Sequence, residues 1–441
     1  MKKYSLSALV AAGLLVGGLS VGSASAADLG GNCCADLEER IAELEATTAR
    51  KGNRKVSLTI SGWVAEQVVF WDDGEEQNVY VGGIGTTLAS HFKFTGQATI
   101  TPGWYAGYVI HVEVYGSETL NKVNQIQATG STLYDTGPNF TGISTLQSFW
   151  FIKSDHLGKL SVGKQSQASD NTAILPDGSG SLVPANFVQF DYGGFFLRNS
   201  SNGALSATNW SGVLGCADCN GIPLNSVRYD SPTFAGFSVS ASWGEDDFWD
   251  VAARYAGEFN GFKVAVATAY SESSDNNSNV IDGAFVQADD TQFWQIGAYV
   301  EHVPTGIFVY GAYGDLDGID TNTVSDNHFW YAKAGLRERW SPLGHTVLYG
   351  EYAQYQNDAL FQDAALTNGG AGPNCAGVAS CDSEMQLWGL GVVQEVDAAA
   401  MSIWLSYRHI EADINDVLGP VQGEIATDDF QYIKAGALIN F

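Results

Sequence analysis

Basic side chains recur on one face of the segments in which apolar and polar residues alternate. Residues 237–243, for example, read Phe-Ser-Val-Ser-Ala-Ser-Trp, so one face is apolar and the other is polar. Because a Lys or Arg that faces hydrocarbon costs about 2–4 kcal/mol, we expect the basic residues to line water. Seven hold such positions: Arg228, Arg254, Lys333, Arg337, Arg339, Arg408 and Lys434. Carboxylates share this parity at Glu113, Glu301, Glu351 and Glu395. Opposed acids and bases on a wet wall would order water and favour small polar solutes over apolar ones.

Signatures of enzyme chemistry are absent from the sequence. The seven histidines show no close metal-ligand spacing, and no serine stands in a nucleophile-elbow setting. The Gly-Gly-Ile-Gly run at residues 82–85 does not lie between a strand and a helix, which argues against a dinucleotide-binding loop. Two alternatives from other classes stay open: a secreted all-β glycoside hydrolase with a two-carboxylate site, and an adhesin or lectin-like barrel.

The alternating segments predict sixteen strands joined by two kinds of connection. Short turns alternate with long loops rich in Gly, Asp, Asn and Ser. The predicted strands are residues 56–70, 88–100, 104–116, 147–154, 159–166, 225–230, 237–243, 248–258, 262–272, 291–302, 307–315, 328–340, 345–357, 385–395, 400–412 and 428–441. No apolar run is long enough for a spanning helix, and this pattern is typical of an all-β, 16-stranded antiparallel transmembrane barrel over residues 55–441. A soluble β-sandwich with an apolar core is the competing architecture.

Composition excludes a disordered chain and a nucleic-acid-binding protein. The 441 residues include 51 Gly, 12% aromatic and only 16% charged residues, which is too apolar for disorder. Acidic residues number 49 against 21 basic, and the formal charge of -28 opposes binding to phosphates. Residues 1–26 are predicted to be a signal peptide, with Lys2 and Lys3 before an apolar stretch and Ala24-Ser25-Ala26 as the cleavage site. We therefore expect an exported protein.

Residues 27–54 are predicted to form a separate periplasmic segment with a short α-helix. Asp36 can cap this helix, and Gly52 can end it. Leu37, Ile41 and Leu44 follow heptad spacing, which predicts a short coiled coil between subunits. The alternative is a helix packed on its own domain, because so short a helix is marginal in water without partners.

The six cysteines fall into three close pairs. We expect local loop disulfides for Cys216 with Cys219 and for Cys375 with Cys381, because exported cysteines can oxidise. A zinc site built from these two pairs is the alternative. The residues before Cys33 lack the apolar character of a lipidation site, so the role of Cys33 and Cys34 stays open.

Three stretches of the chain resemble the general porins of alphaproteobacteria. They are residues 36–62, with Leu-Glu-Glu-Arg-Ile-Ala-Glu-Leu-Glu and Lys-Val-Ser-Leu-Thr-Ile-Ser-Gly, residues 156–165, His-Leu-Gly-Lys-Leu-Ser-Val-Gly-Lys-Gln, and residues 432–441, Tyr-Ile-Lys-Ala-Gly-Ala-Leu-Ile-Asn-Phe. The resemblance implies a homotrimer of 16-stranded barrels in the bacterial outer membrane, in contact with its lipid and lipopolysaccharide. It implies passive diffusion of small hydrophilic solutes and ions, with Phe441 as the signal that the outer-membrane assembly machinery reads.

The resemblance also implies a third long loop that folds inward and narrows the pore. This constriction loop would be residues 166–225, with Asp170, Asp177 and Asp191 as its acids. The seven basic residues would stand opposite these acids, since a pore selects by the charges at its narrowest point. Lys164 would join them, because related porins place a basic residue here, although its parity points outward.

No cofactor and no metal site are expected from the sequence. Acidic loop clusters such as residues 72–76, 245–247 and 315–320 would hold Ca2+ or form a solvated acidic surface. Loop cysteines and an unusually long third loop depart from the pattern of the family.

Overall fold

The computed structural model describes ten stretches of the chain. They are residues 55–85, 87–114, 123–126, 143–215, 217–244, 247–274, 291–318, 326–368, 372–376 and 380–441. The predicted signal peptide and the helix with Leu37, Ile41 and Leu44 lie outside these residues, as do Cys33, Cys34 and Cys216. No helix in the described stretches is long and apolar enough to cross a membrane.

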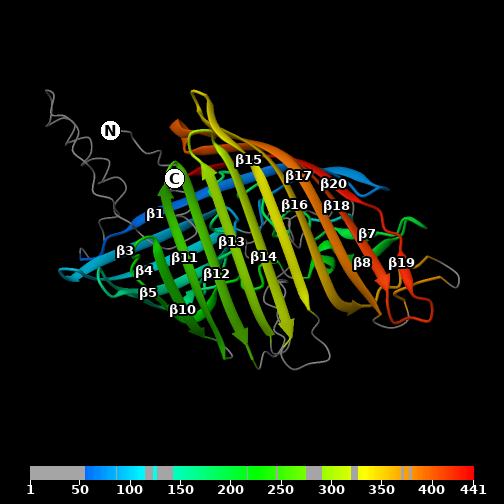
Figure 1. Ribbon diagram of the computed structural model, residues 1–441, viewed down its shortest axis with the longest axis horizontal. Helices are drawn as coiled ribbons and strands as arrows, with labels where there is room; N and C mark the ends of the chain where they lie inside the picture. Colours follow the sequence, from blue (N-terminus) through cyan, green and yellow to red (C-terminus); the bar gives the residue numbers. More distant parts are fainter. Residues whose placement is uncertain are drawn as a thin grey trace.

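Sixteen antiparallel strands of the described residues close into a barrel (Figure 1). They are β1 (Thr59–Asp72), β3 (His91–Thr101), β4 (Trp104–Val114), β5 (Ile143–Ser154), β6 (Gly158–Gln165), β9 (Leu224–Asp230), β10 (Phe237–Gly244), β11 (Phe248–Phe259), β12 (Phe262–Ser273), β13 (Thr291–His302), β14 (Ile307–Gly318), β15 (Asn327–Ser341), β16 (Gly344–Phe361), β17 (Cys381–Val396), β18 (Met401–Asp416) and β20 (Phe430–Asn440). Each predicted strand corresponds to one of them, so the predicted fold class is confirmed. The competing β-sandwich is wrong, because the sheet is continuous.

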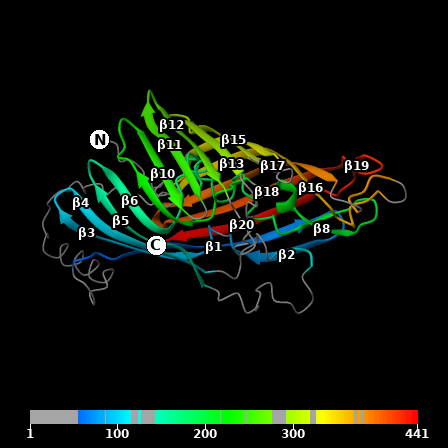
Figure 2. The same ribbon diagram turned by 90° about the horizontal axis from the view of Figure 1, so that it is seen from below.

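The sheet closes where the first strand meets the last. β1 pairs with β20 from Trp63 to Asp72, and Gly62 and Phe441 exchange two backbone hydrogen bonds of 3.0 Å. The other edge of β1 is shared, because β3 pairs with its beginning and β2 (Gln77–Gly82) with its end. Figure 2 shows β1 beside β20 and β2. A second short strand, β19 (Gly423–Ile425), extends the sheet from β18. The sequence did not predict β2 or β19.

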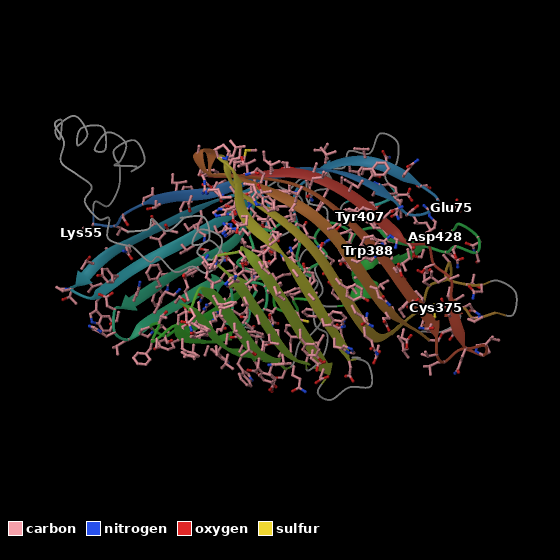
Figure 3. The ribbon with its side chains drawn as sticks, turned by 45° about the horizontal axis from the view of Figure 1, so that its top comes forward. Lys55, Glu75, Cys375, Trp388, Tyr407 and Asp428 are labelled. Carbon is pink, nitrogen blue, oxygen red and sulfur yellow. A yellow bond between two sulfur atoms is a disulfide. The ribbon has the colours of Figure 1, made fainter. Side chains whose placement is uncertain are left out.

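The outer face of the barrel carries the apolar parity. On β1, Val64 and Val68 are 55% and 46% exposed, while Ala65 and Val69, each next in the sequence, are buried. Near one rim, Trp and Tyr pair across neighbouring strands, as Trp388 and Tyr407 do with ring centroids 5.3 Å apart (Figure 3). The equivalent pairs are Trp249 with Tyr270, Trp294 with Tyr313, and Trp330 with Tyr352. This row is the interfacial aromatic girdle of a membrane barrel.

The wall of the barrel is uneven in height. β6, β9 and β10 have 8, 7 and 8 residues, whereas β15 to β18 have 15 to 18. A transmembrane strand needs about 9–11 residues, so the wall formed by β6, β9 and β10 is too low to span the hydrocarbon alone. We call this part the low wall.

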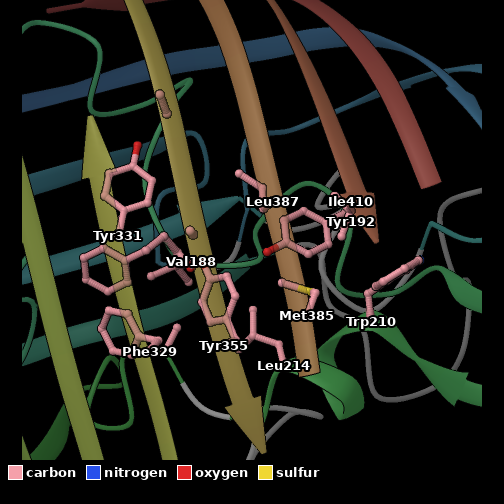
Figure 4. Packing of buried hydrophobic residues seen from close by; sticks show 14 of the residues in the cluster. Val188, Tyr192, Trp210, Leu214, Phe329, Tyr331, Tyr355, Met385, Leu387 and Ile410 are labelled. Atoms are coloured by element: carbon pink, nitrogen blue, oxygen red, sulfur yellow. Dashed lines mark hydrogen bonds between the residues drawn. The ribbon is translucent and has the colours of Figure 1, made fainter. Parts of the chain in front are cut away.

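The segment between β6 and β9 is called the third loop, and its described residues, 166–215 and 217–223, lie inside the barrel. It contains two short paired strands, β7 (Phe196–Arg198) and β8 (Leu205–Asn209), and a helical turn, α3 (Trp210–Leu214), capped by Asn209. Outside this loop, a 3-10 turn, η1 (Asp397–Ala399), joins β17 to β18. Side chains from the third loop pack on the inner faces of β15 to β18 (Figure 4). The cluster includes Val188, Tyr192, Trp210 and Leu214 from the loop and Phe329, Tyr331, Tyr355, Met385, Leu387 and Ile410 from the wall. We call the part of the barrel formed by β13 to β18 the tall wall. Its inner face is a packed core and is not exposed to water.

Candidate functional site: the pore and its third loop

An ion pair fixes the third loop to β15. The Lys333 ammonium donates to Asp177 at 2.6 Å and to the Ala185 carbonyl at 2.8 Å. Both side chains are at most 1% exposed. Sequence parity placed Lys333 on the inner face, but the wall there meets the loop and not water. The charges neutralise each other and therefore set no field across an open lumen.

The loop is held in the same way at β20 and β1. Lys434 forms an ion pair with Asp191, and the Gln67 amide donates to the other carboxylate oxygen of Asp191 at 2.6 Å. Lys434 is 1% exposed and Asp191 is 6% exposed. A predicted wall cation and a predicted loop acid therefore meet directly, as a structural contact.

Arg408 and Arg337 are also buried and paired. Arg408 binds both oxygens of Glu351, at 2.7 and 2.9 Å, and donates to the Asn186 carbonyl of the loop at 2.7 Å. Arg337 binds Glu395 at 2.8 and 3.0 Å. The expectation that these arginines line water is wrong, because the loop covers the tall wall from β13 to β18.

Wall side chains also hold the loop backbone. Tyr310 donates its hydroxyl to the Ala173 carbonyl at 2.6 Å, and Tyr355 does the same to Phe187. At β13 the loop approaches so closely that a Cβ added to Gly297 would overlap the Ala173 carbonyl oxygen. Glycine at position 297 is therefore needed for the loop to reach the wall.

The first turn of the third loop is fixed to β9, β10 and β11. Arg228 donates to the carbonyls of Ser166 and Gln167 at 2.9 and 2.8 Å, and Arg254 donates to Thr172 at 3.1 Å. Burial raises the pKa of the nearby Asp170 carboxyl to about 7, although the charge of Arg228 opposes this shift. The predicted residues Arg228, Arg254 and Asp170 therefore lie together, and both arginines hold the loop.

Two predicted constriction residues do not stand at the loop. Lys164 pairs across strands with Ser148 on the outward parity, and its ammonium donates to the Thr145 carbonyl at 3.2 Å. Arg339 forms an ion pair with Asp397 beside a short turn, and their side chains are 45% and 36% exposed. Both predictions are corrected, since strand parity sets the direction of Lys164 and Arg339 lies at the rim.

The polar face that the packed loop leaves half exposed belongs to β3, β4, β5 and β6. It carries Lys93, Lys153 and Lys159, together with neutral polar groups such as Thr95 and Gln97. These lysines share the inward parity: Lys93 pairs with His111, and Lys153 pairs with Lys159. They are not among the predicted site residues, although the alternation in residues 91–101 assigns Lys93 to the polar face. On the same inward parity, Val109, Phe149 and Phe151 form a small buried cluster.

Extracellular loops are tied to the third loop at one mouth. Arg198 of β7 forms a buried ion pair with Asp73 at 2.8 Å, and Asp363 accepts from the Thr208 amide and hydroxyl, both at 2.8 Å. Cys375 forms a disulfide with Cys381, one of the two predicted pairs. Cys219 is also disulfide-bonded. Glu75, Cys375 and Asp428 lie toward the end of the barrel opposite Lys55 (Figure 3).

The acidic loop clusters do not assemble a metal-ligand group in the described part of the chain. Asp73, from the first cluster, is taken by Arg198. The group of three that does come together is His409, Glu411 and Asp429, with His409 Nε2 3.0 Å from Glu411 and 3.3 Å from Asp429. His409 and Glu411 lie on the outward parity of β18, Asp429 directly precedes β20, and both carboxylates are exposed.

The closed wall, its girdle and an internal loop agree with comparisons to known proteins. The sequence profile of the Gram-negative porin family matches residues 8–416. The chain belongs to this family. The chitoporin of Vibrio furnissii is 26% identical over 340 residues, which cover 70% of this chain and 84% of that protein. This porin is therefore a channel and not an enzyme, and the glycoside hydrolase and adhesin alternatives fall away.

Solved structures show the same fold at low sequence identity. The anion-selective porin of Comamonas acidovorans aligns with a TM-score of 0.54 and 15% identity, covering 88% of this chain and all of that one. OprB of Pseudomonas putida aligns with a TM-score of 0.52 and 10% identity, covering 92% and 97% of the two chains. The porin resides in the bacterial outer membrane and forms a passive diffusion channel for small hydrophilic solutes.

Proposed function

We propose that solutes cross this porin between the third loop and the inner face of β3 to β6. The observation that carries the proposal is the path of the loop, whose hydrogen bonds reach β1, β9 to β18 and β20. The loop meets β5 at its first residue, Ser166, whose hydroxyl accepts from the Gln147 amide at 3.2 Å. The opposite face keeps half-exposed polar side chains at Lys93, Thr95, Gln97 and Tyr105. Water and polar solutes can replace one another along such a face at little cost.

A matched pair of substitutions tests this path. Gln97→Trp places a large ring in the lumen, whereas Ala98→Trp places the same ring on the outer face of the same strand, β3. We expect planar-bilayer conductance and liposome swelling with sugars to fall for Gln97→Trp and to stay at the wild-type level for Ala98→Trp. Equal conductance for both variants would show that the path runs elsewhere.

We also propose that three copies associate through the low wall. The strands β6, β9 and β10 are too short to face lipid alone, yet their outer side chains are apolar and exposed, such as Val239 at 54% and Tyr229 at 41%. A second copy of the chain would shield the short strands from lipid and would bury their exposed apolar side chains. The heptad residues Leu37, Ile41 and Leu44 would add a short coiled coil to this trimer.

Unheated SDS gels over a temperature series test the proposed trimer. Val239→Trp should lower the temperature of trimer dissociation, because the ring collides with the neighbouring copy. Val309→Trp on the tall wall, where Val309 is 56% exposed, should leave that temperature unchanged. Replacing Leu37, Ile41 and Leu44 with Asp should also lower it. Equal dissociation temperatures for the wild type and Val239→Trp would remove the low wall from the interface.

We also propose that, within the porin family, the chain belongs to the general porins of alphaproteobacteria. It is supported by the motifs in residues 36–62, 156–165 and 432–441. In this setting Phe441 would serve the outer-membrane assembly machinery, and the outer surface would contact lipopolysaccharide. Ca2+ at the acidic loops is a further proposal that metal titration of the purified porin would test.

A further inference from the structure

Two lysines oppose each other directly on the lumen wall. Lys153 of β5 and Lys159 of β6 are cross-strand partners on the inward parity, one step from the short turn that joins the strands. Like charges in this position are destabilising. Lys93 lies on β3 of the same face, where it pairs with His111, six residues along the strand from Thr99 in the row of Lys153. We call these three residues the lysine cluster.

One carboxylate, that of Asp230, lies at ion-pair distance from the lysine cluster. Asp230 binds Lys159 at 3.1 Å, but Asp230 is also held by Arg228 at 2.7 and 2.9 Å, so one carboxylate serves two cations. Neither Lys93 nor Lys153 has a carboxylate within ion-pair distance among the residues that the structure describes. This part of the lumen is therefore positive.

The third loop does not supply the missing charge. Among its acids, Asp177 and Asp191 are already paired with Lys333 and Lys434 on the far wall. Asp170 lies beside Arg228 and Arg254, and Asp218 lies near Asp170. Neutral hydrogen-bonding groups stand beside the lysines instead, because Tyr105 pairs across strands with Lys153 and Thr99 lies opposite Tyr105. Ammonium groups with nearby hydroxyls are suited to a small oxyanion, which accepts several charge-assisted hydrogen bonds.

We propose that the lysine cluster binds doubly charged oxyanions, with phosphate-bearing solutes as the class, and makes this porin pass anions in preference to cations. Two facing ammoniums are best neutralised by one dianion, which relieves their mutual repulsion. The overall charge of -28 would predict the opposite preference, but the charges that line a narrow lumen dominate selection over charges on distant loops. This inference rests on the solute path proposed above.

Planar-bilayer recording tests the proposal with the full chain. The reversal potential in a KCl gradient should indicate a preference for chloride over potassium, and inorganic phosphate should block the chloride current. Lys93→Gln, Lys153→Gln and Lys159→Gln combined should reverse the preference and raise the half-blocking phosphate concentration about tenfold, equivalent to about 1.4 kcal/mol. Lys164→Gln, a lysine of β6 on the outward parity, is the matched control and should behave as wild type.

The outcomes separate this inference from the channel itself. The proposed role of the lysine cluster is wrong if the wild type conducts but prefers potassium. It is also wrong if the triple variant keeps the wild-type reversal potential and phosphate block. In both cases the proposed solute path is unaffected. A wild type that folds into heat-modifiable barrels but does not conduct overturns the solute path. Heat modification on gels shows that each variant has folded before it is recorded.

Discussion

At the scale of single residues, charge pairs inside the barrel act as attachments of the third loop. Lys333 with Asp177 and Lys434 with Asp191 each join wall to loop with almost no exposure to water. A buried pair gains little over an apolar contact, but removing one partner leaves an uncompensated charge. These residues therefore decide where the loop lies, and the ion preference is set by other side chains.

Replacing Lys333 alone should be far more damaging than replacing the pair. Lys333→Met leaves Asp177 charged and buried, and we expect the folded barrel to lose about 3–5 kcal/mol of stability. Guanidinium unfolding in detergent measures this loss. The double variant Lys333→Met with Asp177→Leu should recover most of the stability, since apolar residues of similar volume can replace a buried pair. No recovery in the double variant would contradict the assigned pairing.

Gly297 should be sensitive to a single methyl group. Gly297→Ala places its Cβ against the Ala173 carbonyl, so the loop must move away from β13 and the single-channel conductance should change. Gly311→Ala is the control, because the nearest atom to its added Cβ, the Tyr331 carbonyl oxygen, lies 3.6 Å away. If bilayer recordings show the same conductance for wild type and Gly297→Ala, the close approach is not essential.

Asp428 should make the extracellular mouth less stable at neutral pH. Burial, and then the charges of Glu75 and Asp73, raise the pKa of the Asp428 carboxyl above its ordinary range. The folded protein therefore holds this proton more tightly than the unfolded chain, and stability falls as pH rises through that window. Asp428→Asn should melt at a higher temperature than wild type at pH 7, and the two curves should converge below about pH 4. A difference that persists at low pH would point to another cause.

Parity along the chain predicted which charged residues face inward, but not what they meet there. Alternation assigns Arg408 and Lys434 to the inner face because a strand turns every second side chain the same way. Whether that face is wet depends on the path of the third loop, which is set by contacts between residues such as Asn186 and Arg408, 222 positions apart. Sequence periodicity is local and carries no record of such contacts.

At the scale of elements, the sixteen long strands were predictable and the small ones were not. Long strands can be recognised in the sequence by alternation bounded by turn residues, as in β11 and β12 around the Asn260-Gly261 turn. β2, β7, β8 and β19 have only three to six residues and pair with a neighbouring segment of the chain, so their alternation is too short to distinguish them from loop residues. β5 begins at Ile143, earlier than predicted, because its alternation is interrupted by a register shift opposite His111 and Val112.

At the scale of the whole molecule, the last residue completes the barrel. Phe441 and Gly62 close the sheet through two backbone hydrogen bonds, while the Phe441 side chain stays 59% exposed. The backbone thus has a structural task, which any residue except proline could perform, and the ring is left available for recognition during assembly.

Removing the ring should therefore affect delivery more than stability. Phe441→Ala should refold from urea into detergent with a dissociation temperature close to that of wild type, yet reach the outer membrane in cells at a lower level. Quantitative blotting of outer-membrane fractions, beside gels of refolded protein, measures both. Equal losses in both assays would assign Phe441 to packing alone.

The uneven rim has a consequence for the bilayer around a single barrel. Next to β9 the bilayer would have to become thinner, while next to β16 it could keep its full thickness. An isolated copy would therefore tilt or deform the membrane locally. This hydrophobic mismatch costs free energy along every ångström of the short side, whichever side chains are present there. Neighbouring copies that bring their short sides together relieve the elastic strain of the lipid, so the shape of the rim itself draws barrels toward one another.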